Sequence, residues 1–203
     1  MPLASASRLE RLDLVHPVFA DVSVFRSLLS GPAIRSSLKT LSLIDAKFGI
    51  GANDGRTQRK WSESEAATVA VFVGGLSNLV RLRIDESHLR PGHLRTLLSN
   101  LPRLRCLGIT GQFGTRPQDE LTSLGDDEFR YIAETCPDLH SLDLSCHRFS
   151  TCVGVEAVLM GCPDLKVFRC TGSSIPDDRM APLLWRHQNL LLDRKSTRLN
   201  SSH

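Results

Sequence analysis

The sequence predicts an α/β solenoid in which parallel β-strands line a concave face and helices cover the convex face. Leucine accounts for 32 of the 203 residues. The pattern Leu-x-x-Leu-x-Leu recurs in six ordered copies, and a segment of helical character follows most of them. One such unit cannot bury its apolar edge, whereas stacked copies share a continuous core. The repetition therefore predicts the architecture.

Each copy of the pattern predicts a short strand, because the second and third apolar positions alternate with polar ones. Every copy runs in the same direction, so the strands are expected to be parallel. The last copy is weaker, with Phe168 and Cys170 in place of leucines, and Leu190 indicates the start of a seventh. The six copies begin at Leu9, Leu38, Leu79, Leu104, Leu139 and Leu165.

A turn and a helix are expected after each strand. Ser62 and Glu65 have the spacing of a capping box at a helix start, and Pro91 suits a first helical turn. Asp126 is expected to cap the helix that carries Phe129, and Pro176 to open a last helix. In the turns, an apolar residue usually stands seven positions after the second leucine: Phe19, Phe48, Leu89, Phe149 and Ile175.

Residues 124–175 contain the most specific motif, Cys-Pro-Asp-Leu, which begins at Cys136 and again at Cys162. Each copy lies between a predicted helix and a predicted strand. This stretch resembles the cysteine-containing leucine-rich repeats of F-box substrate receptors and other ribonuclease-inhibitor-like proteins, and residues 1–192 resemble them loosely. No F-box precedes the repeats in these 203 residues. The Cys or Asn that the family often has five places after the second leucine is also absent, because those positions hold Pro17, Ala46, Ser87, Gln112, His147 and Ser173.

The resemblance implies a leucine-rich-repeat horseshoe without catalytic activity. Its first functional implication is the substrate-recognition part of an F-box type (SCF) ubiquitin-ligase receptor, which would dock the SCF adaptor through an F-box absent from this fragment. The alternatives are a scaffold or inhibitor of the ribonuclease-inhibitor kind, or the sensor repeats of a larger receptor. A third alternative is enzymatic, a GTPase-activating leucine-rich-repeat protein, which would need an arginine such as Arg81 or Arg83 to raise hydrolysis. We expect a cytoplasmic or nuclear protein, because six cysteines without a visible signal peptide indicate reduced thiols.

The chain is expected to be one array over residues 1–192, with about six repeats and the start of a seventh, truncated at both ends. Residues 193–203 read DRKSTRLNSSH, which matches the translation of a common sequencing adapter and is expected to be non-native. Without them the chain carries 22 basic and 21 acidic residues, because Asp193, Arg194, Lys195 and Arg198 are removed. The net charge of +3 then falls to +1.

Function is expected on the concave face, where the polar strand residues next to the buried leucines point. This face has four arginines, comparable acidic charge and no aromatic residue, so a protein partner fits better than nucleic acid. The alternative interpretation is that these residues are simply solvated strand positions that bind no partner. The candidate protein-binding residues are Arg11, Asp13, Thr40, Ser42, Arg81, Arg83, Asp85, Glu86, Thr110, Ser141, Asp143 and Arg169.

Other chemistry finds little support in the sequence. Hydrophobic residues at 41% and charged residues at 23% are ordinary for a folded protein, and no apolar run reaches the ~18–20 residues that cross a bilayer. Gly49 and Gly51 lack the third glycine of a dinucleotide loop, because Asp54 stands there. No catalytic motif, cofactor motif or C-x-x-C metal pair is present, and His88 and His93 are expected at the surface.

Overall fold

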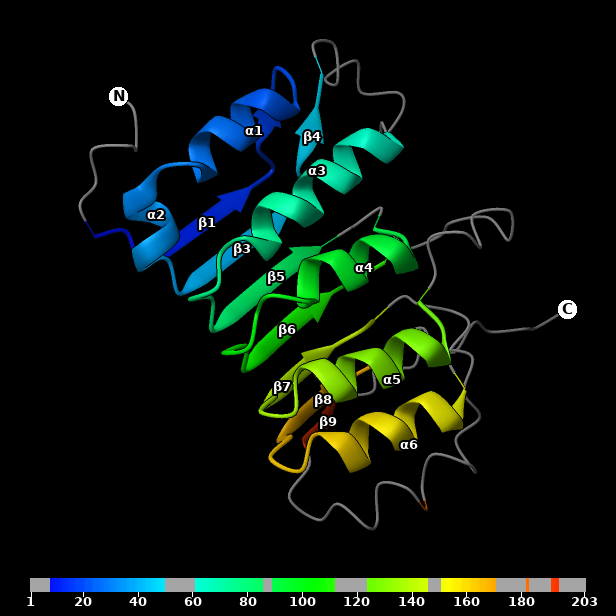
Figure 1. Ribbon diagram of the computed structural model, residues 1–203. Coiled ribbons are helices and arrows are strands. Elements are labelled where there is room, and N and C mark those ends of the chain that lie inside the picture. The colour runs from blue at the N-terminus through cyan, green and yellow to red at the C-terminus, as the bar shows by residue number, and fades with distance from the viewer. Residues whose placement is uncertain are drawn as a thin grey trace, which may run out of the picture.

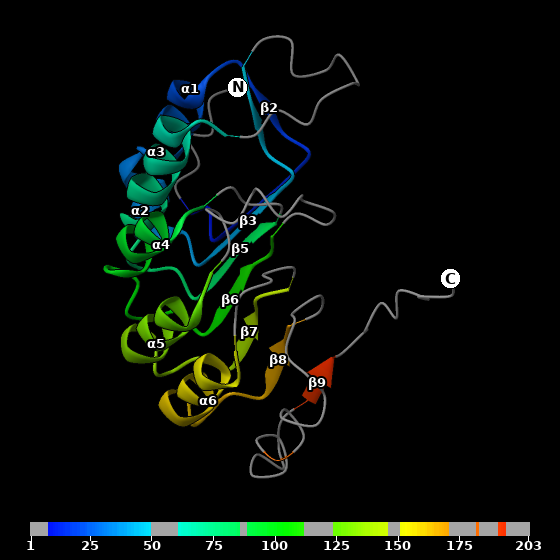
Figure 2. The same ribbon diagram turned by 90° about the vertical axis from the view of Figure 1, so that its right-hand side faces the viewer.

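In the computed structural model, seven parallel strands form one curved sheet and the helices lie along one of its faces (Figures 1 and 2). The structure describes residues 8–49, 61–85, 89–111, 124–145, 151–170, 182 and 191–193. The strands are β1 (Arg11–Val15), β3 (Thr40–Ile44), β5 (Arg81–Asp85), β6 (Cys106–Ile109), β7 (Ser141–Asp143), β8 (Val167–Arg169) and β9 (Leu191–Asp193), side by side in that order. This is the leucine-rich-repeat architecture that the sequence predicts.

The strand register reproduces the sequence repeat. Leu12 pairs with Leu41, Leu41 with Leu82, and Leu82 with Leu107, so equivalent leucines form a row across the sheet. The row continues through Leu142 to Phe168, and all of these side chains are buried. Buried leucines of neighbouring copies therefore stack on one another, which is the continuous core that single repeats lack.

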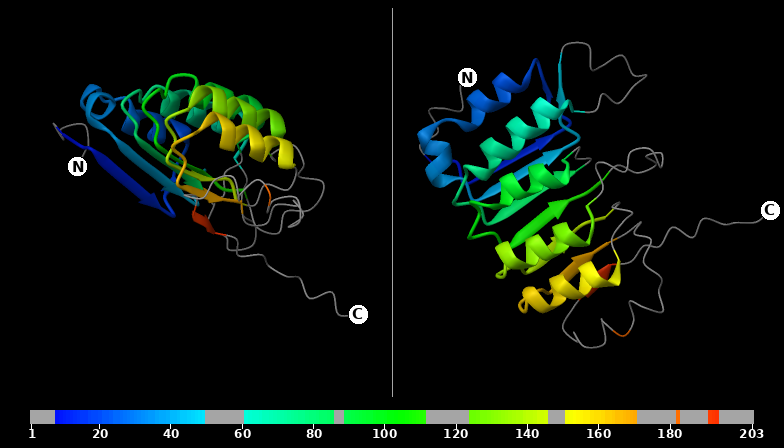
Figure 3. Two further views of the ribbon diagram at one scale, coloured as in Figure 1. Left: turned by 90° about the horizontal axis from the view of Figure 1, so that it is seen from below. Right: turned by 45° about the vertical axis from the view of Figure 1, so that its right-hand side comes forward.

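The helices cover the convex side of this core. They are α1 (Val22–Leu29), α2 (Pro32–Ser37), α3 (Glu63–Gly74), α4 (Pro91–Leu98), α5 (Asp126–Thr135) and α6 (Cys152–Gly161). Seen from below, they lie above the sheet and leave its other face uncovered (Figure 3). Each packs apolar residues inward, such as Val69 and Val73 of α3 and Phe129 and Ile132 of α5.

The turns after the first two strands are built alike. The short strands β2 (Val18–Phe19) and β4 (Lys47–Phe48) pair in parallel, which stacks Phe19 on Phe48 with ring centroids 5.4 Å apart. Trp61 packs edge-on against Phe48 and donates from Nε1 to the carbonyl of Ala46 at 2.7 Å. Of the predicted turn residues, Phe19, Phe48 and Leu89 are buried, whereas Phe149 and Ile175 lie outside the described residues.

Three helices begin with the same device, in which the third helical residue accepts from the backbone N–H of the residue just before the helix. Glu65 accepts from Ser62, as the predicted capping box requires, and Glu128 accepts from Gly125. In α4 the acceptor is Nδ1 of His93, which accepts from Arg90 N at 3.2 Å. His93 is 8% exposed and its Nε2 lies 2.9 Å from Glu63, so the expected surface position of His93 is wrong.

Two further expectations are corrected. Asp126 is not the cap of its own helix, because Gly125 occupies that position and Asp126 is the first helical residue. The seventh strand exists, but Val167 pairs with Leu191, 24 residues on, so its register differs by one residue from the spacing of 25 that Leu190 predicts. The predicted helix after Pro176 and the adapter-like residues 194–203 lie outside the described residues.

Candidate functional site

The concave face, which none of the described helices covers, contains an open hollow of about 540 Å³ that crosses six strands. Polar and apolar groups both line it, and nine of its sixteen residues are polar or charged, because the alternation of each strand sends leucine into the core and its neighbours to this face. The lining residues are Arg11, Asp13, Val15, Thr40, Leu41, Ser42, Ile44, Arg81, Leu82, Arg83, Cys106, Leu107, Gly108, Ser141, Asp143 and Arg169.

The structure brings most of the predicted site residues together in this hollow. Asp85 and Thr110 lie beside it, at the carboxyl ends of β5 and β6, and Glu86 lies outside the described residues. Ser42 belongs to the lining but is only 8% exposed, so it offers little surface. The predicted residues that line the hollow are Arg11, Asp13, Thr40, Ser42, Arg81, Arg83, Ser141, Asp143 and Arg169.

Two arginines of the hollow are paired with aspartates two residues further along the same strand. Nε of Arg11 lies 2.6 Å from Oδ2 of Asp13, and both side chains are well exposed. Arg83 donates to both oxygens of Asp85 from Nε at 2.8–2.9 Å, and its Nη2 lies 2.7 Å from Oδ2. Residues two apart on a strand point to the same face, which is why these partners meet.

The pair in β5 is the stronger of the two. The Asp85 side chain is only 12% exposed and also accepts from Oγ1 of Thr110, at 3.2 Å. The hydrogen bond to Asp85 raises the pKa of the Arg83 guanidinium, and the charge of Asp143 adds to this effect. Asp85 and Thr110 therefore fix the Arg83 side chain rather than offering themselves to a partner.

Arg81 differs from these arginines. It is exposed, and its guanidinium has no hydrogen bond or ion pair with any residue in the described part of the chain, whereas its backbone N–H donates to the carbonyl of Lys39. Its neighbours in the register are Thr40 on one side and Cys106 on the other, neither of which carries a negative charge. Arg81 is thus a cation available to a ligand.

Gly108 deepens the hollow next to Arg83. A Cβ atom at this position would lie 3.4 Å from Cγ of Arg83 and 3.8 Å from Cβ of Asp143, so a side chain would occupy the space between them. The repeat pattern places Gly108 on the concave face, but the candidate binding residues omit it because glycine has no side chain. Its signal in the sequence is a glycine inside a strand, which indicates a close approach by another group.

Asp143 forms the far wall of this central part. Its Oδ1 accepts from the backbone N–H and the hydroxyl of Ser145, at 3.1 and 2.7 Å, which orients the carboxylate. Its Oδ2 has no hydrogen-bond partner among the described residues. The hollow therefore presents cationic groups on β5 and an anionic oxygen on β7, separated by Gly108.

This arrangement suits recognition by charge and shape. In the described residues, no three His, Cys, Asp or Glu side chains lie close enough together to hold a metal ion. None of the helices that the structure describes has the length and apolar character needed to span a membrane.

No protein-family model matches the sequence, and no curated protein is significantly similar to it. Among solved structures, an internalin of Listeria monocytogenes is similar, with a TM-score of 0.34 and 13% identity over 98% of this chain and 72% of that protein. A leucine-rich-repeat protein of Leptospira interrogans has a TM-score of 0.31 and 14% identity, over 94% of this chain and 62% of its own. The leucine-rich-repeat fold of this chain is established by its own repeated register of parallel strands and outer helices.

Proposed function

We propose that the chain is a non-catalytic protein-binding module whose partner lies on the concave face. The observation that carries this proposal is the open hollow across six strands, lined by side chains of both charges. A rigid sheet holds these groups at fixed spacing before any partner binds. Little conformational entropy is therefore lost in ordering the site when a partner with complementary groups binds.

The test is site-specific photo-crosslinking on the two faces. A photoreactive amino acid replaces Ser141 in the hollow and, as the matched control, the exposed Glu134 on the convex helix α5. We expect the concave variant to crosslink to a distinct protein, identified by mass spectrometry, that the convex variant does not capture. Equal products from both faces would contradict the proposal.

Within this function, we assign the chain to the substrate-recognition repeats of an F-box type ubiquitin-ligase receptor. The repeated Cys-Pro-Asp-Leu motif supports this assignment. Cys136 and Cys162 each follow a helix, and both are buried, with Cys162 Sγ 3.5 Å from the carbonyl oxygen of Cys136. The repeats would hold a target near a ubiquitin-loaded enzyme and so raise its effective concentration.

This assignment places the protein in the cytoplasm or nucleus. The cysteines of the described residues are free thiols, the state that these reducing compartments maintain. The adaptor of the ligase would bind an F-box encoded outside residues 1–203.

Sequencing the complete transcript from source RNA tests the ligase assignment. We expect an upstream segment with F-box character, and co-purification of the complete protein with the SCF adaptor. A different upstream module, or a capped array alone, would overturn the assignment and favour sensor repeats or a scaffold of the ribonuclease-inhibitor kind. The same reads test whether DRKSTRLNSSH is encoded in the genome.

A further inference from the structure

We propose that the partner presents an acidic polypeptide segment, one carboxylate of which binds Arg81 and the free edge of the Arg83 guanidinium above Gly108. This inference rests on the proposed function and specifies the chemistry of the ligand. It follows from the uncompensated charge of Arg81 in the hollow and from the space that Gly108 leaves.

The charge of the hollow favours an anionic ligand. Its lining contains four arginines and two aspartates, and Asp85, the partner of Arg83, lies beside it, so basic groups exceed acidic groups by one among these residues. Arg11 and Arg83 each have an aspartate partner within the chain, whereas Arg81 has no partner among the described residues. A carboxylate at Arg81 compensates this charge without displacing an existing ion pair.

The guanidinium of Arg83 can contribute to the same carboxylate. Asp85 engages Nε and Nη2, which leaves Nη1 without a partner in the described residues. Arg81 and Arg83 stand two residues apart on the same face of β5, at about 6.8 Å along the strand. A carboxylate has two oxygens and accepts charge-assisted hydrogen bonds at each, so one group can contact both arginines.

The floor beneath this position is open. Gly108 pairs with Arg83 across the neighbouring strands and contributes no side chain. The nearby Cys106 and Ser141 are also small. Asp143 lines the same hollow, and its Oδ2, which has no hydrogen-bond partner among the described residues, can accept from a backbone N–H or a basic side chain of the bound segment. An acidic residue over β5 with a hydrogen-bond donor over β7 therefore matches the hollow.

Nucleic acid matches it less well. A row of phosphates across the strands would meet Asp13 and Asp143 as well as the arginines. Single-stranded nucleic acid also binds through aromatic side chains on which bases stack, and no aromatic residue lines the described hollow. A polypeptide can place its carboxylates selectively, whereas nucleic acid carries one charge at every step.

Fluorescence anisotropy tests the proposal on the full chain at an ionic strength of about 0.15 M. The probes are a labelled peptide of alternating Glu and Ser, a peptide of alternating Lys and Ser, and a single-stranded oligonucleotide of equal length. We expect the Glu-Ser peptide to bind best. Arg81→Glu is expected to weaken its binding about fivefold or more, because it replaces an attraction by a repulsion.

Arg105→Glu is the matched control. It changes the net charge equally, and Arg105 is an exposed residue that precedes β6 and lies outside the hollow. Its effect on binding is expected to stay within about twofold if long-range charge is screened. Gly108→Val fills the space over the floor of the hollow and should also weaken binding of the Glu-Ser peptide. Thermal melting of each variant verifies that it is folded.

The outcomes separate the two proposals. The acidic-ligand inference is overturned if the Glu-Ser peptide binds no better than the Lys-Ser peptide. It is also overturned if Arg81→Glu and Arg105→Glu lose equal affinity for the Glu-Ser peptide. Concave crosslinks that form in that case keep the protein-binding function intact. Tighter binding of the oligonucleotide than of the Glu-Ser peptide overturns the inference in favour of nucleic acid. Crosslinks without preference for the concave face reject the proposed function itself.

Discussion

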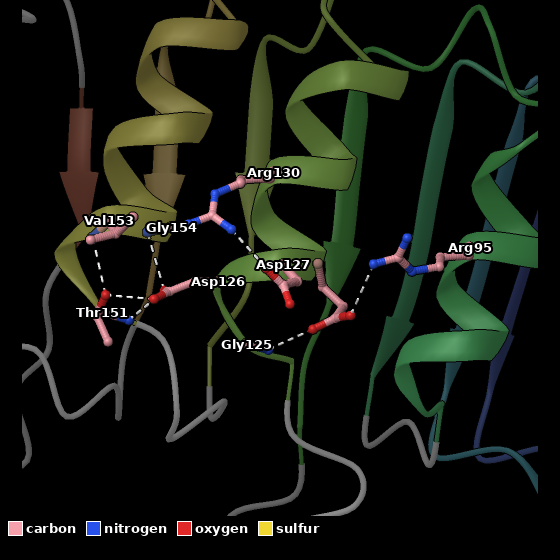
Figure 4. A network of polar contacts seen from close by, with 9 residues as sticks. Arg95, Gly125, Asp126, Asp127, Arg130, Thr151, Val153 and Gly154 are labelled. Carbon is pink, nitrogen blue, oxygen red and sulfur yellow. Dashed lines mark hydrogen bonds and ion pairs between the residues drawn. The ribbon is translucent and has the colours of Figure 1, made fainter.

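Asp126 of α5 caps the N-terminus of α6 through Thr151. Its Oδ1 accepts from the backbone N–H of Thr151 at 2.7 Å and from that of Gly154 at 3.1 Å, and its Oδ2 accepts from the Thr151 hydroxyl at 2.6 Å (Figure 4). The Thr151 hydroxyl in turn accepts from Val153 N. One carboxylate therefore satisfies helix-terminal donors in the next repeat, which couples the two repeats.

Replacing Asp126 by Ala is expected to lower the free energy of unfolding by about 1–3 kcal/mol, because it leaves the donors at the start of α6 without their acceptor. Urea denaturation followed by circular dichroism measures this change. The matched control is Asp127→Ala, since Asp127 is 74% exposed and, among the described residues, pairs only with Arg130 on the helix surface. The free energy of unfolding of the control should stay within about 0.5 kcal/mol of the parent value. Equal losses of stability in both variants would contradict the coupling of the two repeats.

Glycines let α5 and α6 approach closely. A Cβ at Gly161 would lie 2.6 Å from Cβ of Ala133 and 3.2 Å from its carbonyl oxygen, so a side chain there forces the helices apart. Gly92, in the first turn of α4, has no atom within 4 Å of its Cβ position.

Alanine at these two glycines is therefore expected to have opposite effects. Gly161→Ala should destabilise by about 1–3 kcal/mol through overpacking. Gly92→Ala should raise stability by up to about 1 kcal/mol, because it reduces the entropy of the unfolded chain without a clash. The melting temperature is expected to fall for Gly161→Ala and to rise for Gly92→Ala. A stabilised Gly161→Ala variant would show that the helices separate without cost.

The sequence predicted the sheet well because its signal is periodic. The alternation around Leu82 and Ile84 fixes which residues are buried, and equal patterns in successive repeats fix their pairing. The same period places Arg83 and Asp85 on one face, so their ion pair is a direct consequence of the strand.

The errors arose where contacts join different repeats. The spacing around Asp126 indicates a helix start, but its partners at Thr151 and Gly154 lie 25 and 28 residues away and leave no local pattern. His93 occupies the position that Glu65 and Glu128 hold in other helices, and its ring nitrogen replaces their carboxylate as acceptor. The repeat register places Gly108 on the concave face, but the candidate binding residues do not include it because glycine has no side chain to contact a partner.

Leu142→Ala tests the register at the middle of the array. Leu142 is fully buried in β7 between Leu107 and Phe168, so truncation is expected to cost about 2–5 kcal/mol of unfolding free energy. Ser141→Ala, at the adjacent half-buried position on the concave face, should change stability by less than about 0.5 kcal/mol. Urea titrations compare the two variants, and similar midpoints would mean that the two faces of β7 are exchanged.

Differential alkylation tests the packing of the repeated cysteines. Burial raises the pKa of Cys136 to about 12, with a further contribution from the charge of Cys162, and burial raises that of Cys162 to about 11. Both thiols therefore remain protonated at about pH 8, and only a thiolate attacks iodoacetamide at an appreciable rate. We expect Cys106 and Cys152, which are half-buried, to be modified about tenfold faster or more, as measured by mass spectrometry of peptides.

Unfolding in concentrated guanidinium chloride should make the cysteines react at similar rates, which controls for effects of neighbouring sequence. Because the raised pKa values belong to the folded state, these two thiols also give a pH dependence. Their contribution to stability is complete below the ordinary thiol pKa of 9.0 and is lost as the pH rises towards about 11 and 12, since the unfolded chain ionises first. Rapid alkylation of Cys136 in the folded protein would show that the Cys-Pro-Asp-Leu turns open to solvent, and the core assignment of both cysteines would then be wrong.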